Sequence, residues 1–363
     1  MNKLDNVISI DLPSGLFCDN GKSANISMSP KITLGLGFNK RGYFFNDGLN
    51  KINKINILDI GFPKYEENDA IRLIEAKDIT KIMPKHGNDV HKYKRGKVLI
   101  IAGSIGYTGA CILSSLAAIS AGSGIVKVIS PLSLKNQYES ILIEAIIKYV
   151  DDQGSGKFKA SHIEEIKNEI SWADSILIGP GLSNDEIDIE FKLKLIKLIN
   201  KPLVLDASAF QPIISGDLDM TCLPKECILT PHYNEFSKIF NMDVDKLSND
   251  PIDAINEIMA LLDGRVLILK GPTTIMVDSN KQKYFMSHGN KQMSVAGTGD
   301  ILSGICVASL AQKLTVDESA LYSSFLHAEC AFQYNEKIST HGLIASDLIK
   351  MMPHAMEALN ELS

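Results

Sequence analysis

The stretch Lys97-Val98-Leu99-Ile100-Ile101-Ala102, followed by Gly103-Ser104-Ile105-Gly106-Tyr107-Thr108-Gly109-Ala110, sets the pattern for most of this chain. Its first six residues form an almost unbroken apolar run, which is typical of a strand buried on both faces of a parallel sheet. The glycine-rich part predicts a tight turn, and the alanine-, leucine- and serine-rich residues 111–120 predict a helix. A strand, a turn and a helix in this order are the first half of a βαβ unit.

The same alternation continues toward the C-terminus. Further apolar runs that predict strands lie at 125–129, 175–178, 203–205, 227–229 and 266–269. Stretches with helical periodicity lie between them, at 161–170, 187–199, 233–240 and 252–262. Strands that alternate with helices predict an α/β domain with a mostly parallel central sheet flanked by helices. We assign residues 71–360 to this domain.

Residues 1–65 follow a different pattern. Residues 7–11, 32–36 and 55–60 predict three short strands with hardly any helical sequence between them. Three such strands cannot have both faces of a parallel sheet covered by helices of their own. We therefore interpret this segment as a partial α/β N-terminal segment, and the polar stretch 63–69 as a linker.

The composition limits the classes of function. The 363 residues are 45% hydrophobic and 22% charged, which is typical of a soluble globular protein. A formal net charge of −6 argues against a broad nucleic-acid surface, and no apolar run approaches the roughly 20 residues of a membrane span. The six cysteines contain no Cys-x-x-Cys pair and favour free thiols in a reducing compartment. We expect a cytoplasmic protein that binds neither nucleic acid nor membrane.

A second glycine-rich turn is Ser294-Val295-Ala296-Gly297-Thr298-Gly299-Asp300, and the apolar residues 301–310 after it predict a helix. The unpaired N–H groups of a first helical turn bind phosphate oxygens readily. The helix dipole would hold Asp300 ionised, so that it could accept a proton from a substrate hydroxyl beside the phosphate. Four residues of Gly-Thr-Gly-Asp alone leave a purely structural turn equally open.

The turn Gly103 to Ala110 is compatible with either a ligand loop or a structural turn. It lacks the Lys-Ser or Lys-Thr of a Walker loop, and its glycine spacing does not fit the dinucleotide-binding fingerprint. Ile178-Gly179-Pro180-Gly181-Leu182 ends the next strand. Asp206 ends another strand, where it could bind a metal-held phosphate or cap a helix.

Two further loops carry charged residues. In Thr230-Pro231-His232-Tyr233-Asn234-Glu235 no third zinc ligand is nearby, so His232 either orients a ligand or belongs to an ordinary helix start. In Leu269-Lys270-Gly271-Pro272-Thr273-Thr274 a lysine, a tight turn and two hydroxyls suit a nucleotide phosphate. Since five such loops follow predicted strands, a parallel sheet would gather them along one edge.

Read together, residues of roughly 80–355 resemble the ADP- or ATP-dependent NAD(P)H-hydrate dehydratase family, whose fold is ribokinase-like. The matching motifs are Gly96 to Ser104 with His91-Lys92, Tyr107 to Ala110, Ile178 to Leu182, Leu203 to Ala207, Leu229 to His232 with Glu235, Leu269 to Gly271, Gly289-Asn290, Gly297 to Asp300 and Gly342 to Asp347. The chain departs from the family at Tyr233-Asn234, where Pro-Gly is usual, and at Lys291-Gln292, where Pro-Gly is again usual.

The resemblance implies a reaction and residues for it. The reaction is the ADP- or ATP-dependent dehydration of (6S)-NAD(P)HX, through phosphorylation of the ring hydroxyl and loss of phosphate, with Mg²⁺ and with Asp300 as the base. By resemblance the substrate contacts are Ala110, Gly181, His232 and Asp300, and the nucleotide contacts are Lys270, Gly271, Pro272, Thr273, Thr274 and Gly299. A small-molecule substrate and a homo-oligomer are expected. The residues do not distinguish ADP from ATP.

Residues 1–65 are similar to the C-terminal end of the NAD(P)H-hydrate epimerase domain, through Ile10-Asp11-Leu12-Pro13-Ser14-Gly15-Leu16. By resemblance Asp11 would contact the substrate and Ser14 would help to hold K⁺. The asparagine- and glycine-rich substrate loop of that domain has no counterpart in this sequence, so we expect no epimerase activity from the chain by itself.

Two alternatives to the dehydratase stay open from sequence. A ribokinase-like kinase for a small molecule, such as a vitamin precursor, would use the same Gly-Thr-Gly-Asp turn and keep its phosphorylated product. A non-catalytic nucleotide-binding relic is the other alternative. The presence of Lys270, His232 and Asp300 together argues against the relic.

Overall fold

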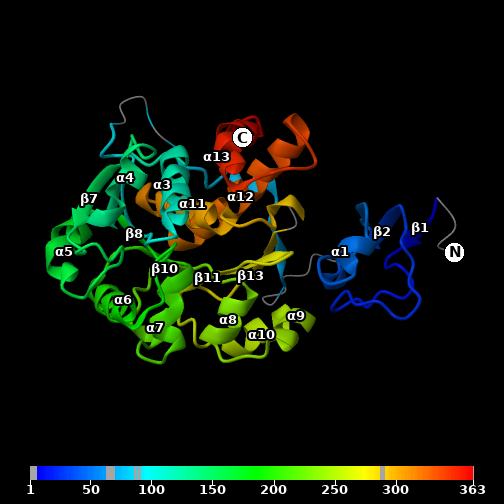
Figure 1. Cartoon of the computed structure of the whole chain (residues 1–363). Helices are drawn as coiled ribbons and strands as arrows, with labels where there is room; N and C mark the ends of the chain where they lie inside the picture. Colours follow the sequence, from blue (N-terminus) through cyan, green and yellow to red (C-terminus); the bar gives the residue numbers. More distant parts are fainter. Residues whose placement is uncertain (1–5, 63–69, 86, 88–90, 287–290, 363) are drawn as a thin grey trace. The chain divides into compact units, whose positions relative to one another are not determined.

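The computed structural model describes residues 6–62, 70–85, 87, 91–286 and 291–362. The chain divides into two compact units (Figure 1). One unit takes in Met1–Ala70 and Met242–Glu257, and the other takes in Ile71–Asn241 and Ile258–Ser363.

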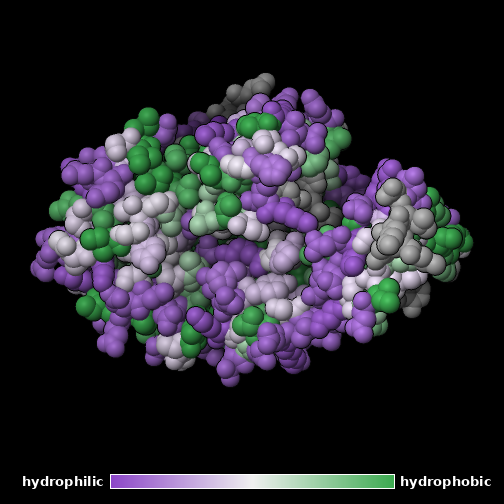
Figure 2. Space-filling view, turned by 45° about the vertical axis from the view of Figure 1, so that its right-hand side comes forward, coloured by the Kyte–Doolittle hydropathy of each residue, from purple (hydrophilic) through white to green (hydrophobic). Residues whose placement is uncertain are grey.

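The small unit contains a three-stranded parallel sheet in the order β1-β2-β3. Its strands are β1 (Ile8–Ile10), β2 (Ile32–Leu36) and β3 (Ile55–Leu58), with the short helices η1 (Arg41–Tyr43) and α1 (Gly48–Lys51) between the last two. The three strand predictions are confirmed, whereas the predicted linker 63–69 lies outside the described residues. Large apolar side chains, Ile8 and Ile10 among them, lie on the surface of this unit (Figure 2).

The large unit is built on a ten-stranded sheet in the order β4-β13-β12-β11-β10-β9-β8-β5-β6-β7. The strands are β4 (Arg72–Leu73), β5 (Lys97–Ile101), β6 (Ile125–Pro131), β7 (Ile146–Val150), β8 (Ser175–Ile178), β9 (Leu203–Leu205), β10 (Cys227–Leu229), β11 (Val266–Leu269), β12 (Thr274–Val277) and β13 (Lys283–Met286). All neighbouring pairs are parallel except β11–β12 and β12–β13. The prediction of a mostly parallel sheet is confirmed.

Helices cover both faces of this sheet (Figure 1). One layer contains α3 (Thr108–Ser120), α11 (Thr298–Ala311), α12 (Val316–Lys337) and α13 (Ala345–Asn360), which pack against one another. The opposite layer contains α5 (His162–Trp172), α6 (Glu186–Leu198), α7 (Gln211–Ile214) and α8 (Tyr233–Ile239). The large unit also contains α2 (Ala76–Ile79) and α4 (Lys135–Glu139), whereas α9 (Val244–Asn249) and α10 (Pro251–Ile258), apart from its last residue, belong to the small unit. The 3₁₀ turns of the large unit are η2 (Leu132–Leu134), η3 (Ala207–Phe210), η4 (Met220–Cys222) and η5 (Lys291–Met293).

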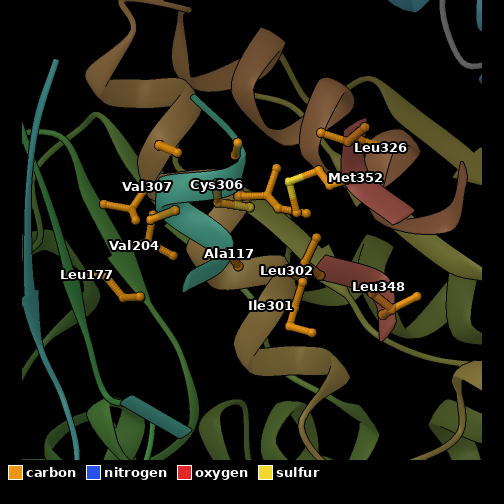
Figure 3. Close-up of a cluster of buried hydrophobic side chains, with 14 of the residues drawn as sticks. Ala117, Leu177, Val204, Ile301, Leu302, Cys306, Val307, Leu326, Leu348 and Met352 are labelled. Atoms are coloured by element: carbon orange, nitrogen blue, oxygen red, sulfur yellow. The ribbon is translucent and has the colours of Figure 1, made fainter. Parts of the chain in front are cut away.

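Helix α11 lies at the centre of the apolar core of the large unit (Figure 3). Nearly all of its residues are buried, as expected for a helix that is apolar on every side. Gly304 makes this possible, because a Cβ there would lie only 2.3 Å from the carbonyl oxygen of Ser114 in α3. The tight packing fixes where α11 begins, at the turn that contains Asp300.

None of the helices in the described parts of the chain combines the length and the apolar composition that crossing a membrane requires.

Candidate active site

The loops singled out in the sequence meet at one edge of the sheet. Strands β11, β10, β9, β8 and β5 are adjacent and parallel in that order, so the segments that follow them emerge side by side. The start of α11 reaches the same edge, because a Cβ at Gly299 would lie 3.2 Å from Nζ of Lys270. The predicted gathering of the loops is therefore observed, while the roles of their residues remain proposals.

Lys270, at the end of β11, forms a buried ion pair with Asp206, at the end of β9. Its Nζ lies 2.8 Å from Oδ1 of Asp206, whose side chain is almost fully buried. Oδ1 also accepts a hydrogen bond of 2.9 Å from the Ala207 amide, so Asp206 caps η3, one of the two roles open from sequence. Burial disfavours the Lys270 ammonium, but the carboxylates of Asp206, Glu235 and Asp300 outweigh it and raise the pKa of Lys270.

Asp300 lies in the first turn of α11, and its carboxyl group titrates near neutral pH. Burial, followed by the negative charge of Asp206, raises the pKa of Asp300 to about 7, although Lys270 acts in the opposite direction. The expectation that Asp300 is held ionised is therefore only partly met at neutral pH, because burial disfavours the carboxylate. A carboxylate with such a pKa is a stronger base than an exposed aspartate at pH 7 to 8.

His232 caps helix α8. Its Nδ1 accepts a hydrogen bond of 3.3 Å from the Glu235 amide, and Oε2 of Glu235 accepts one of 2.9 Å from the His232 amide. The alternative that His232 belongs to a helix start is thus observed, through its Nδ1. The ring is half-exposed, and its Nε2 lies 3.5 Å from Oε1 of Glu235. A parallel bridge between His232 and Lys270 sets the two loops side by side.

The loop after β11 has the shape of a small open turn. Gly271 and Pro272 are exposed, Thr273 is buried, and Thr274 begins β12. A Cβ at Gly271 would lie 2.6 Å from the ring of Tyr233. The bulky Tyr233, one of the departures from the family pattern, therefore packs where residue 271 has no side chain.

At the part of the edge formed by the loops after β5 and β8, the contacts are made by backbone and small side chains. Gly181 has a φ of +66°, and a Cβ there would lie 2.4 Å from the Tyr107 carbonyl oxygen and 3.0 Å from Cβ of Ala110. Oγ of Ser104 donates a hydrogen bond of 2.8 Å to the Gly181 carbonyl. The structure therefore brings together Ala110 and Gly181, two of the predicted substrate residues.

The start of α3 also reaches the start of α11. Gly297 has a φ of +93°, and a Cβ there would lie 2.7 Å from Cδ1 of Leu113 in α3. The motif Gly289-Asn290 lies outside the described residues. Lys291, the second departure from the family pattern, begins the 3₁₀ turn η5.

In the small unit, Asp11 follows β1 and lines a cavity of about 460 Å³. Its Oδ1 lies 2.6 Å from Nζ of Lys40 and accepts a hydrogen bond of 3.0 Å from the Leu36 amide, and the Lys40 contact lowers the pKa of Asp11. Ser14 is exposed and does not line this cavity.

Sequence reasoning missed the pairing of Asp206 with Lys270 and the influence of Glu235 on both Lys270 and Asp300. The two paired residues are 64 positions apart and belong to strands separated by β10. The position of each at the end of an apolar strand was visible, but the strand order that makes them neighbours was not.

These observations define a class of protein: an α/β protein with the ribokinase-like fold. A ribokinase-like superfamily protein from Enterococcus faecalis shares the fold with a TM-score of 0.70 at 22% identity, over 82% of this chain and 99% of that one. The ADP/ATP-dependent NAD(P)H-hydrate dehydratase of Bacillus subtilis, co-crystallised with ATP/Mg²⁺, shares it with a TM-score of 0.67 at 23% identity, over 80% of this chain and 99% of that one.

Residues 98–354 match the sequence profile of the NAD(P)H-hydrate dehydratase family. The bifunctional NAD(P)H-hydrate repair enzyme Nnr of Dictyoglomus turgidum is 31% identical to the chain over an alignment of 362 positions that covers 97% of this chain and 69% of the relative. The chain belongs to the NAD(P)H-hydrate dehydratase family. It is therefore a lyase that acts in the repair of hydrated NAD(P)H, which confirms the resemblance seen in the sequence.

Proposed function

We propose that the chain dehydrates (6S)-NADHX and (6S)-NADPHX, the water adducts of the reduced nicotinamide ring, and consumes ADP or ATP in doing so. The observation that carries the proposal is Asp300, a half-buried aspartate with a pKa of about 7 at a helix start beside Lys270. This arrangement suits removal of a proton from a hydroxyl next to a phosphate group.

The reaction follows in two steps. The Asp300 carboxylate takes the proton of the ring hydroxyl, whose oxygen attacks the terminal phosphorus of the nucleotide and displaces AMP or ADP. The bond between the ring carbon and the phosphorylated oxygen then breaks, a neighbouring ring proton is lost, and NAD(P)H and inorganic phosphate result. Lys270 and the amides at the start of α11 would offset the negative charge of the transferred phosphoryl group.

The residues at this edge fit a nucleotide-bound Mg²⁺. No cluster of three or more His, Cys, Asp or Glu suited to a metal occurs among the described residues, but Mg²⁺ typically binds through one or two carboxylates together with substrate phosphates. Glu235 would hold it through Oε1, since Oε2 of Glu235 accepts a hydrogen bond from the His232 amide and Asp206 is buried and bonded to Lys270. Bound there, the ion would neutralise phosphate charge.

The substrate would lie against the other half of the edge. Ala110, Gly181 and His232 are proposed to contact the hydrated nicotinamide nucleotide. The proposed nucleotide contacts are Lys270, Gly271, Pro272, Thr273, Thr274 and Gly299. Both ADP and ATP are kept as donors, and the ATP/Mg²⁺ named for the Bacillus subtilis structure supports use of an adenine nucleotide with Mg²⁺.

One assay tests the proposal against its alternatives. The chain is incubated with NADHX, Mg²⁺ and either ADP or ATP, while NADH absorbance and released phosphate are followed together. Equal amounts of recovered NADH and phosphate support the dehydratase. A stable phosphorylated product would support a kinase, and the absence of both products would support a non-catalytic relic.

For the small unit we propose that Asp11 contacts an NAD(P)H hydrate and that Ser14 helps to hold K⁺. The cavity lined by Asp11 and the word "bifunctional" in the names of the longer relatives support a ligand site here. The expected lack of epimerase activity remains a prediction. Chiral separation of (6R)- and (6S)-NADHX after incubation with and without K⁺ tests it, and D11N is the variant that would abolish any interconversion.

We further propose a cytoplasmic homo-oligomer. The six cysteines, all free, support a reducing compartment. Light scattering coupled to size-exclusion chromatography measures the oligomeric state.

A further inference from the structure

Two charged residues of helix α6 are enclosed in the protein and have no part in the reaction described above. Lys192 is 0% exposed and Asp188 is 1% exposed. They are four residues apart, so they lie on the same face of the helix, one turn from each other. Buried charges are costly and are normally compensated by specific contacts.

The Lys192 ammonium reaches back to the loop between β8 and α6. Its Nζ donates a hydrogen bond of 2.8 Å to the Ser183 carbonyl oxygen and one of 3.4 Å to Oδ1 of Asn184. In this loop Ser183 follows directly after Gly181 and Leu182. A charge-assisted bond to a carbonyl is stronger than a neutral one, especially away from water.

Asp188 contributes charge to this arrangement. Burial raises the pKa of Asp188, while Ser183 and the Lys192 ammonium act in the opposite direction. Burial lowers the pKa of Lys192 to about 8, and the negative charges of Asp188 and then Asp185 oppose that change. Asp188 therefore helps to keep the Lys192 ammonium charged at neutral pH.

Gly181 is held from the other side by different contacts. The Ser104 hydroxyl binds its carbonyl oxygen, and the Gly103 amide donates a hydrogen bond of 2.8 Å to the Pro180 carbonyl. After Gly181, the loop is held by Lys192 and by an ion pair between Asp185 and Lys157. That ion pair lies near the surface, where such pairs contribute little, so the buried Lys192 is the stronger of the two.

We propose that Lys192 is a positioning residue for the substrate half of the site. By binding the Ser183 carbonyl, it holds the loop so that the Gly181 backbone keeps its place against Tyr107 and Ala110. Lys192 itself touches neither nucleotide nor substrate. The inference rests on the proposed function, because the contact between Gly181 and the substrate is itself part of that proposal.

The proposal predicts a specific dependence on pH. The charged groups around the ammonium are Asp188 on α6, Asp185 in the loop and Lys157 in the loop after β7. Above pH 8 the ammonium loses its proton and its bond to Ser183 weakens. The KM for NADHX should therefore rise on the alkaline side, while the KM for the nucleotide should not.

The test compares K192M, K192R and K194M in steady-state kinetics. K192M should raise the KM for NADHX about tenfold, the size of one charge-assisted hydrogen bond, and leave kcat and the nucleotide KM near their wild-type values. K192R keeps its charge at all these pH values and should abolish the alkaline rise in KM. Lys194 is on the same helix but exposed and paired with Glu190, so K194M should behave as wild type.

The outcomes separate the inference from the proposed function. Equal effects of K192M on both KM values, or no effect on either, overturn the positioning role. If K192M does not fold, the comparison of wild type with K192R is sufficient. The same alkaline rise in the KM for NADHX in both enzymes would overturn the positioning role of Lys192. If wild type converts no NADHX at all, both the proposed function and this role for Lys192 fail.

Discussion

The two halves of the site are built from different materials. The half proposed to bind the nucleotide relies on charged side chains brought together from strands far apart in the sequence, with Lys270 paired to Asp206 and both acting on Asp300. The half proposed to bind the substrate relies on backbone and on residues without bulk, such as Gly181 against Ala110. The half with Lys270 and Asp300 is therefore suited to stabilising charge, and the half with Gly181 is suited to matching the shape of a ligand. Substitutions should therefore affect the first mainly in kcat and the second mainly in KM.

The largest effect is expected for D300N. It removes the proposed base and keeps the size of the side chain, so kcat for NADHX dehydration should fall about a thousandfold, within the range for loss of general base catalysis. Nucleotide affinity, measured by calorimetry, should change little. A D300N enzyme with kcat near that of wild type would contradict the assignment.

The next largest effect is expected for K270M. Loss of one preorganised cation beside the transferred phosphoryl group should lower kcat about a hundredfold. Because K270M leaves Asp206 buried and unpaired, the free energy of unfolding should fall by about 3 kcal/mol. The double variant K270M/D206N should regain much of that stability in denaturant titrations without regaining activity. Recovery of both together would mean that the pair is structural only.

A smaller effect, mainly on the KM for NADHX and less on kcat, is expected for G181A. A methyl group at a φ of +66° would lie 2.4 Å from the Tyr107 carbonyl oxygen, so the loop must shift. We expect the KM for NADHX to rise about tenfold, with kcat reduced by less. Gly216 also has a positive φ but has open space around it, so G216A serves as the matched control. Similar KM values for NADHX in G181A and G216A would contradict a role of Gly181 in matching the shape of the substrate.

The last prediction concerns the free energy of unfolding and its dependence on pH, not activity. Because folding raises the pKa of Asp300 from 3.8 to about 7, its stabilising contribution is complete below pH 3.8 and is lost as pH rises through 7. D300N should therefore be more stable than wild type by about 2 kcal/mol at pH 8 and by less at pH 5. Denaturant unfolding at the two pH values measures this. A difference that is larger at pH 5 would contradict the burial of an ionisable carboxyl group.

The strand positions could be predicted because apolar runs such as 175–178 and 266–269 end abruptly at glycine or polar residues. The long helices α12 and α13 were not predicted. Helix α12 is buried over most of its length and shows little amphipathic pattern, so its periodicity carries little information. The antiparallel strands β12 and β13 lie inside the sheet and were also not predicted, because they follow β11 without an intervening helix and so break the alternation of strands and helices.

The position of the candidate site could be predicted from the sequence but its electrostatics could not, and the roles of its residues stay predictions. The strand-end position of Lys270 and the helix start at Asp300 were visible in the sequence. The raised pKa of Asp300 was not, because it depends on burial and on the charge of Asp206, which only the folded chain brings near. Lys192 was missed for the same reason, since a lysine on a helix is usually exposed.

In the proposed reaction the ring hydroxyl is phosphorylated before its oxygen leaves the ring. An ¹⁸O label in that hydroxyl shows whether this happens. NADHX prepared in H₂¹⁸O carries ¹⁸O in that hydroxyl, and the phosphate released with ADP or ATP is analysed by mass spectrometry. The released phosphate should contain the ¹⁸O, and D300N should release hardly any labelled phosphate. Unlabelled phosphate, with the ¹⁸O lost to water while NADH is formed, would contradict the proposed reaction.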